Sequence, residues 1–139
     1  MTPRHLALKT LLLAVTCAAL YTAAVSQAQE QTATQFYQAY KAAFTKAKTI
    51  DELLPFMTKA KVDEISQLPK ADWPKAFEMI KDFYVFSNEK VVKETATATG
   101  ATLNVEAIDP DKKKYKATVT LLREGGAWKF SEEDWSPTP

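Results

Sequence analysis

The chain has very few of the residues on which most enzyme sites depend. Among its 139 residues are one histidine, one cysteine and three glycines, and both His5 and Cys17 lie within the first 28 residues. Residues 29–139 therefore cannot form Ser-His-Asp or Cys-His nucleophile systems, or zinc sites built from cysteine and histidine. The glycines form no phosphate-binding loop. We expect no cofactor and no metal, and any catalysis would have to use carboxylates, tyrosines or lysines.

Arginine is scarce as well. Arg123 is the only arginine of residues 29–139, beside fifteen lysines, and with 17 acidic residues the formal net charge of this segment is −1. A domain without a basic excess lacks the electrostatic footprint of a nucleic-acid-binding protein. Bidentate phosphate clamps prefer arginine to lysine. We therefore expect no nucleic-acid partner.

The first 28 residues have the three parts of a secretory signal peptide. A basic start precedes an apolar run over residues 11–25, and a small-x-small site follows at residues 26–28. The run of 15 residues is shorter than the ~20 that a membrane-spanning helix needs. We predict cleavage near Ala28, export to the periplasm or the medium, and no stable membrane anchor. A lipoprotein acylated at Cys17 is the alternative, although Thr16 and the apolar residues that follow are atypical of such a site.

Residues 29–139 have the length of one domain, and their pattern changes from helical to extended half-way. Apolar residues at helical spacing predict helices over residues 33–46, 49–57 and 59–68, and a fourth that starts near Asp72 and ends between residues 83 and 86. Alternation with a period of two then predicts strands over residues 89–98, 102–108, 115–122 and 128–130. We expect residues 131–139, including Trp135, to form a polar tail.

The predicted strands have one apolar face and one polar face. The apolar face holds Leu103, Val105, Val119, Leu121, Trp128 and Phe130. The polar face is rich in threonine and holds Asn104, Glu106, Thr118, Thr120 and Lys129. Because a one-sided sheet must bury its apolar face, the preceding helices are expected to cover it. The sequence thus predicts an α+β fold, with helices on one face of a curved four-stranded antiparallel sheet.

This order of elements, together with the segment Gly-Gly-Ala-Trp-Lys-Phe at residues 125–130, resembles the nuclear transport factor 2-like superfamily, which includes SnoaL-like and ketosteroid isomerase-like proteins. The resemblance covers about residues 34–135. It implies a cone-like fold whose interior can hold a small apolar ligand, and homodimerisation through the sheet. It does not decide the function, because this fold hosts isomerases, dehydratases, transport adaptors and many non-enzymes. The histidine base of enzymatic members has no counterpart here.

Six residues are candidates for a pocket inside this cone: Tyr40, Phe44, Trp73, Glu94, Tyr115 and Trp128. Glu94 interrupts an apolar strand face, and a carboxylate that points into the cone would be desolvated and gain a raised pKa. Tyr40 or Tyr115 could then donate to a substrate oxygen. The alternative for Glu94 is a charge on an edge strand that discourages sheet-to-sheet pairing. The tryptophans could equally be core residues.

Three functions remain open on the sequence alone. We predict an exported, non-catalytic domain that binds a small apolar ligand or a protein partner. The first alternative is an acid–base isomerase or dehydratase that uses a buried carboxylate and a tyrosine. The second is an accessory or inhibitory protein that acts through its surface. A polar group inside the cone, or its absence, separates the first two.

Overall fold

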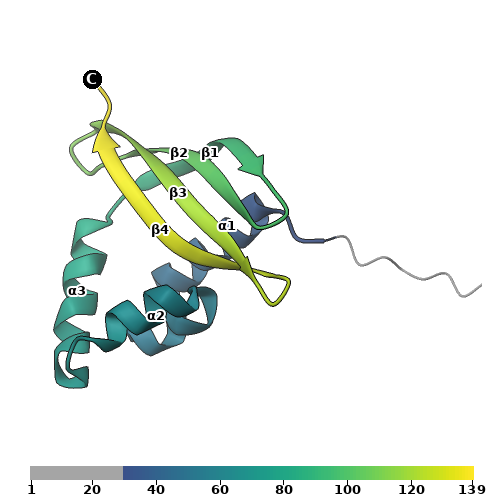
Figure 1. Cartoon of the computed structure of the whole chain (residues 1–139). Coiled ribbons are helices and arrows are strands. Elements are labelled where there is room, and N and C mark those ends of the chain that lie inside the picture. Colours follow the sequence, from purple (N-terminus) through teal and green to yellow (C-terminus); the bar gives the residue numbers. More distant parts are fainter. Residues whose placement is uncertain (1–29) are drawn as a thin grey trace, which may run out of the picture.

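The computed structural model describes residues 30–139, so the predicted signal peptide and its cleavage site lie outside the described residues. Helices α1 (Ala33–Lys46), α2 (Lys59–Ser66) and α3 (Trp73–Phe83) and the 3-10 helices η1 (Ile50–Phe56) and η2 (Lys70–Asp72) come first. Strands β1 (Ser87–Ala96), β2 (Gly100–Ile108), β3 (Lys114–Glu124) and β4 (Ala127–Pro137) follow, and they form an antiparallel sheet in that order. The helices lie to one side of the sheet (Figure 1). The predicted α+β class is confirmed.

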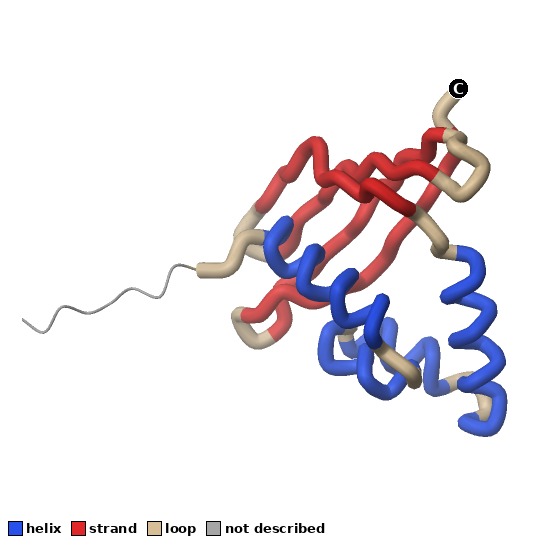
Figure 2. Tube along the Cα trace, turned by 180° about the vertical axis from the view of Figure 1, so that it is seen from behind, coloured by secondary structure: helices blue, strands red, loops and turns tan. Residues whose placement is uncertain are grey.

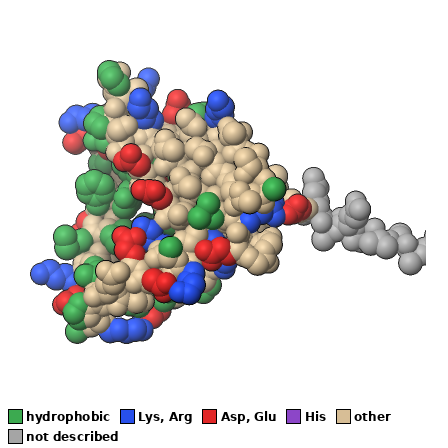
Figure 3. Space-filling view, viewed as in Figure 1, with side chains coloured by type: hydrophobic (Ala, Val, Ile, Leu, Met, Phe, Trp, Pro, Cys, Tyr) green, Lys and Arg blue, Asp and Glu red, His purple; other side chains and the backbone are tan. Residues whose placement is uncertain are grey.

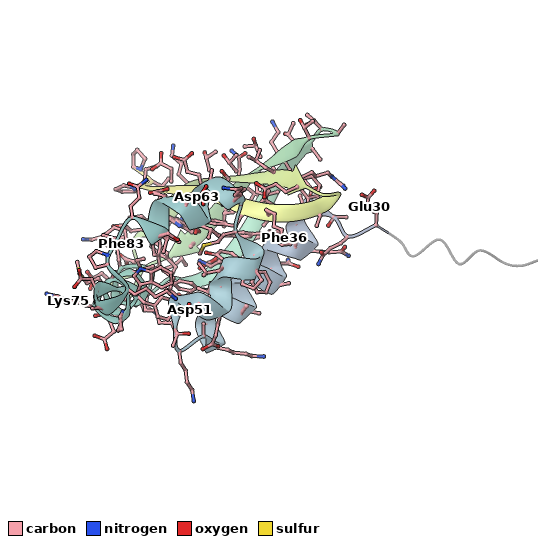
Figure 4. All side chains as sticks on the ribbon, turned by 60° about the horizontal axis from the view of Figure 1, so that its bottom comes forward. Glu30, Phe36, Asp51, Asp63, Lys75 and Phe83 are labelled. Atoms are coloured by element: carbon pink, nitrogen blue, oxygen red, sulfur yellow. The ribbon has the colours of Figure 1, made fainter. Side chains whose placement is uncertain are left out.

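Helix α1 has the bounds that its apolar spacing predicts. It begins with a capping box, in which the Thr32 hydroxyl accepts from the Gln35 N–H at 3.1 Å and the Gln35 side chain accepts from the Thr32 N–H at 3.0 Å. Its buried face holds Ala33, Phe36, Tyr37 and Tyr40. Figure 4 places Phe36 between the helices and the sheet, among packed side chains. This face of α1 therefore forms part of the core.

The sheet is apolar on the side that faces the helices. Leu103 and Val119 have no exposed surface and Trp128 is 6% exposed, whereas Thr118 on the opposite face is exposed. These positions confirm the predicted division of the sheet into a buried and a solvated face. Burial of this face is the main source of stability, because each buried Leu or Val side chain contributes roughly 1.5–3 kcal/mol.

The prediction of a polar tail from residue 131 is wrong, because β4 continues to Pro137. The register between β3 and β4 shifts at Ser131, which has no partner on β3. Such a bulge moves the following side chains to the other face of the strand. Glu133, which pairs with the buried Val119, and Trp135 therefore lie on the side of the sheet that the helices cover.

Helix α3 stands at one end of the sheet rather than beneath its centre (Figure 2). The Lys81 ammonium donates to the carbonyl of Ala47, just after the end of α1, and this contact attaches α3 to α1. The outer side of α3 exposes Met79 and Phe83, which are 64% and 72% exposed. No helix within residues 30–139 has both the length and the apolar character that crossing a membrane requires.

Two neighbouring leucines of β3 test the assignment of the faces. Leu121 is fully buried and Leu122, on the opposite face, is 40% exposed. We expect Leu121→Ala to lower the free energy of unfolding by about 2–5 kcal/mol, because it leaves a cavity in the core. Leu122→Ala should cost less than about 1 kcal/mol. Urea denaturation followed by tryptophan fluorescence measures both values, and equal losses would contradict the assignment.

Candidate functional site

A cavity of about 790 Å³ lies between the helices and β4. Its lining comes from α1, η1, α2, α3 and β4, so no single segment of the chain encloses it. Aromatic side chains make up much of the wall: Tyr40, Phe44, Phe77, Tyr84 and Phe130. The volume is within the range of roughly 300–1,000 Å³ that is usual for small-molecule sites.

The aromatic wall is built by side chains that meet from three elements. Tyr40 and Phe44 are one helical turn apart, so both project from the same side of α1. The Tyr40 ring stacks on Phe130 of β4 with ring centroids 4.5 Å apart, and Phe44 meets Phe77 of α3 edge-on at 6.0 Å. These contacts join helix to strand and helix to helix. They give the cavity a wall of packed rings.

A cluster of polar side chains borders the cavity on β4. The side chain of Glu133 is 8% exposed, and its Oε1 accepts from the Tyr37 hydroxyl at 2.8 Å and from the Trp135 indole N–H at 2.7 Å. The Lys41 ammonium lies 3.6 Å from the same oxygen and 3.2 Å from Oε1 of Glu89. Within residues 30–139 nothing donates a hydrogen bond to the second oxygen of Glu133, Oε2. Since Glu133 lines the cavity, this oxygen remains available to accept.

Two carboxylates share one ammonium group in this cluster, which gives it a formal charge of −1. Burial raises the pKa of Glu89 above its ordinary value, and this effect outweighs the nearby Lys41 ammonium, which lowers it. Burial, reinforced by the charges of Glu133 and Glu89, raises the pKa of Tyr37 far above its usual range. The Tyr37 phenol therefore keeps its proton and acts as a hydrogen-bond donor. Burial also raises the pKa of Tyr40.

The structure brings two of the six predicted pocket residues to the cavity. Tyr40 and Phe44 both line it. Trp73 is 5% exposed and belongs to the core, where its indole N–H donates to the Leu68 carbonyl at 3.1 Å. It begins α3 and helps to fix the approach of that helix.

Glu94 lies outside the cavity on the surface of the molecule. It is exposed, and Oε2 accepts from both the N–H and the hydroxyl of Thr34. Thr34 lies in the first turn of α1, where free amides and the helix dipole favour a negative charge. The register shift between Val91 and Lys93 pairs Glu94 with the buried Leu103, so on the edge strand β1 its side chain lies on the side that the helices cover. Glu94 thus caps α1 rather than entering the cavity.

Tyr115 and Trp128 lie away from the cavity and far apart along the sheet. Tyr115 packs on Phe86 with ring centroids 5.2 Å apart, near the carboxyl end of β4. Trp128 donates from its indole N–H to the Gln31 carbonyl at 2.8 Å, and the Arg123 guanidinium lies 4.1 Å from its ring centroid. Both therefore have contacts that do not involve the cavity.

Sequence reasoning did not single out the polar cluster beside the cavity, which consists of Tyr37, Lys41, Glu89 and Glu133. Of these residues, Lys41 and Glu133 line the cavity. The alternation of Glu133 with Trp135 is the signal that could have indicated a strand in this segment. The bulge at Ser131 reverses the alternation set by Trp128 and Phe130, so the face of Glu133 could not be read from the sequence. Within residues 30–139 no group of three or more acidic, histidine or cysteine side chains is arranged to hold a metal ion.

No protein-family model matches the sequence, and no curated protein matches it. Among solved structures, a similar chain is an NTF2-like protein of unknown function from Shewanella baltica OS155. The two chains are 16% identical with a TM-score of 0.44, and the match covers 79% of this chain and 99% of the other. The fold assignment itself comes from the order of elements and the sheet topology described above.

Replacing Glu89 by glutamine tests the electrostatics of the cluster. Because the pKa of Glu89 is raised in the folded state above its ordinary 4.5, the folded protein holds this proton more tightly than the unfolded chain does. Protonation of Glu89 therefore stabilises the folded protein. This contribution to the free energy of unfolding is fully present below pH 4.5, and it is lost as the pH rises through the pKa that Glu89 has in the folded state. We expect the free energy of unfolding of the wild type, minus that of Glu89→Gln, to fall as the pH rises from 4 to 7. Urea denaturation at each pH measures it, and a rising difference would mean that the Lys41 ion pair dominates.

Proposed function

We propose that this protein is an exported, non-catalytic binding protein that holds a small ligand with an apolar body in the cavity between the helices and β4. The observation that supports the proposal is the cavity of about 790 Å³ with its wall of packed aromatic rings. Export is inferred from the composition of the first 28 residues.

The surroundings of the polar cluster favour binding over catalysis. Residues 29–139 contain no histidine or cysteine. The Tyr37 hydroxyl and the Lys41 ammonium are both held against carboxylates. Groups held in such a network are rigid and orient a ligand well. A pre-formed site that combines aromatic walls with fixed polar groups is typical of ligand recognition.

A neutral aromatic ligand tests for a functional cavity. We expect 2-(1-naphthyl)ethanol to bind with a Kd on the order of 1–100 µM. Burial of its rings favours binding, but this gain must offset the translational and rotational entropy that the ligand loses. Ile80→Trp should weaken binding at least about tenfold, since Ile80 lines the cavity and a larger side chain there fills it. Isothermal titration calorimetry measures both affinities.

The matched control is Met79→Trp on the same helix. Met79 is 64% exposed and does not line the cavity, so this variant should bind within about twofold of the wild type. Absence of binding by the wild type, or equal binding by Ile80→Trp, would contradict the proposal.

Acid–base catalysis is the second candidate, and one observation favours it. Glu133 presents Oε2 without a partner among residues 30–139, while its other oxygen accepts from the Tyr37 hydroxyl. A carboxylate at the edge of an apolar site can remove a proton adjacent to a carbonyl group. In this reaction Glu133, rather than Glu94, would be the base.

Deuterium exchange at the α-carbons of 2-tetralone tests this second candidate. If Glu133 is a base, the wild type should accelerate exchange above the buffer rate, and Glu133→Gln should lose at least about 100-fold of that acceleration. Asp134→Asn is the control, because Asp134 is an exposed neighbour that does not line the cavity. Exchange is followed by proton NMR. A wild type that binds naphthylethanol yet gives the buffer rate would exclude this chemistry for 2-tetralone.

A further inference from the structure

The lining of the cavity carries an excess of negative charge. It includes two lysines and three glutamates, which give a formal net charge of −1, and Glu89 behind Lys41 adds another negative charge. Figure 3 shows acidic side chains interspersed with lysines on the face formed by β4 and the helices below it. In a cavity with low-dielectric aromatic walls, such a charge raises the local concentration of cations.

Both lysines of the lining are already paired with carboxylates. Lys41 lies between Glu89 and Glu133, and the Lys61 ammonium lies 2.7 Å from Glu64. An anionic ligand would have to displace one of these carboxylates and approach the others. It would meet repulsion from Glu133 without gaining a free cation, so the cavity disfavours carboxylates and phosphates.

The group of the site that is still free to form a hydrogen bond is an acceptor, the second carboxylate oxygen of Glu133. Glu133 Oε2 has no donor within residues 30–139, although the Glu133 side chain is more than nine-tenths buried, at 8% exposed. Oε2 is not fully buried, because no polar side-chain atom of residues 30–139 is both fully buried and without a partner. A cation in the cavity can therefore reach this oxygen and donate a charge-assisted hydrogen bond to it. The complementary group on a ligand is therefore a protonated nitrogen.

The aromatic walls suit the same kind of group. The Lys41 ammonium already lies 5.4 Å from the ring centroid of Phe44 and 5.8 Å from that of Tyr84. Ring faces attract cations within about 6 Å of their centroid, and the attraction grows when water is excluded. The same rings line the cavity, so they can also face the cation of a ligand.

From these observations, and resting on the proposed function, we propose that the ligand is an organic amine that binds in its protonated form. Its ammonium group donates to Glu133 Oε2, and its apolar body lies against the aromatic wall formed by α1, α3 and β4. Recognition is by charge and shape together, which separates amines from alcohols and acids of the same size.

Three naphthalene compounds that differ in one group test this proposal by calorimetry at pH 7. They are 2-(1-naphthyl)ethylamine, 2-(1-naphthyl)ethanol and 1-naphthylacetate. We expect the amine to bind about tenfold more tightly than the alcohol, and the acetate to bind most weakly. Because this series uses the wild-type protein, it does not depend on the folding of any variant.

Glu133→Gln should remove the preference for the amine while the alcohol still binds. Asp134→Asn is the matched control, because it removes the same charge one residue away, on the exposed face, and should keep the full preference. Equal affinities of the amine and the alcohol for the wild type, or tighter binding of the acetate, would overturn this inference and leave the proposed cavity function standing. Failure of all three compounds to bind would instead contradict the proposed function.

Discussion

Burial of the inner face of the sheet under the helices is the constraint on which the rest of this structure depends. Leu103, Val119 and Leu121 are fully buried in one core with side chains of the helices that precede them in the chain. Helix α1 packs on the sheet, whereas α3 stands at one end of it (Figure 2). The helices therefore do not fill the space over β4 completely. The cavity exists because the helices cover the sheet unevenly and leave space next to β4.

One bulge in β4 decides the chemistry of that cavity. If β4 kept its alternation past Phe130, Glu132 would lie inside and Glu133 outside. The extra residue at Ser131 places Glu133 and Trp135 on the inner face. It also allows Tyr37 and Lys41 of α1 to meet a carboxylate of the last strand. A buried charge is tolerated there because these groups satisfy one of its oxygens.

Sequence reasoning predicted the fold more completely than the site. The helical spacing over residues 33–46 and the alternation along β2 and β3 are local patterns, so the α+β class and the buried face followed from them. Tyr40 and Phe44 line the cavity, and both lie on the apolar face that the helical spacing predicts. Glu94 was chosen for interrupting a strand, yet it caps α1 through Thr34. That contact joins residues 60 positions apart, and no local pattern reports it.

The sequence by itself determined which residue types are scarce, where the helices and the first three strands form, and which side of the sheet is buried. Each of these depends on composition or on a period of two or 3.6 residues. Only the tertiary structure decided where the cavity lies and which charges border it. The reason is physical: Tyr37, Lys41, Glu89 and Glu133 come from three separate elements, and their meeting depends on the packing of α1 and on the register shift in β4.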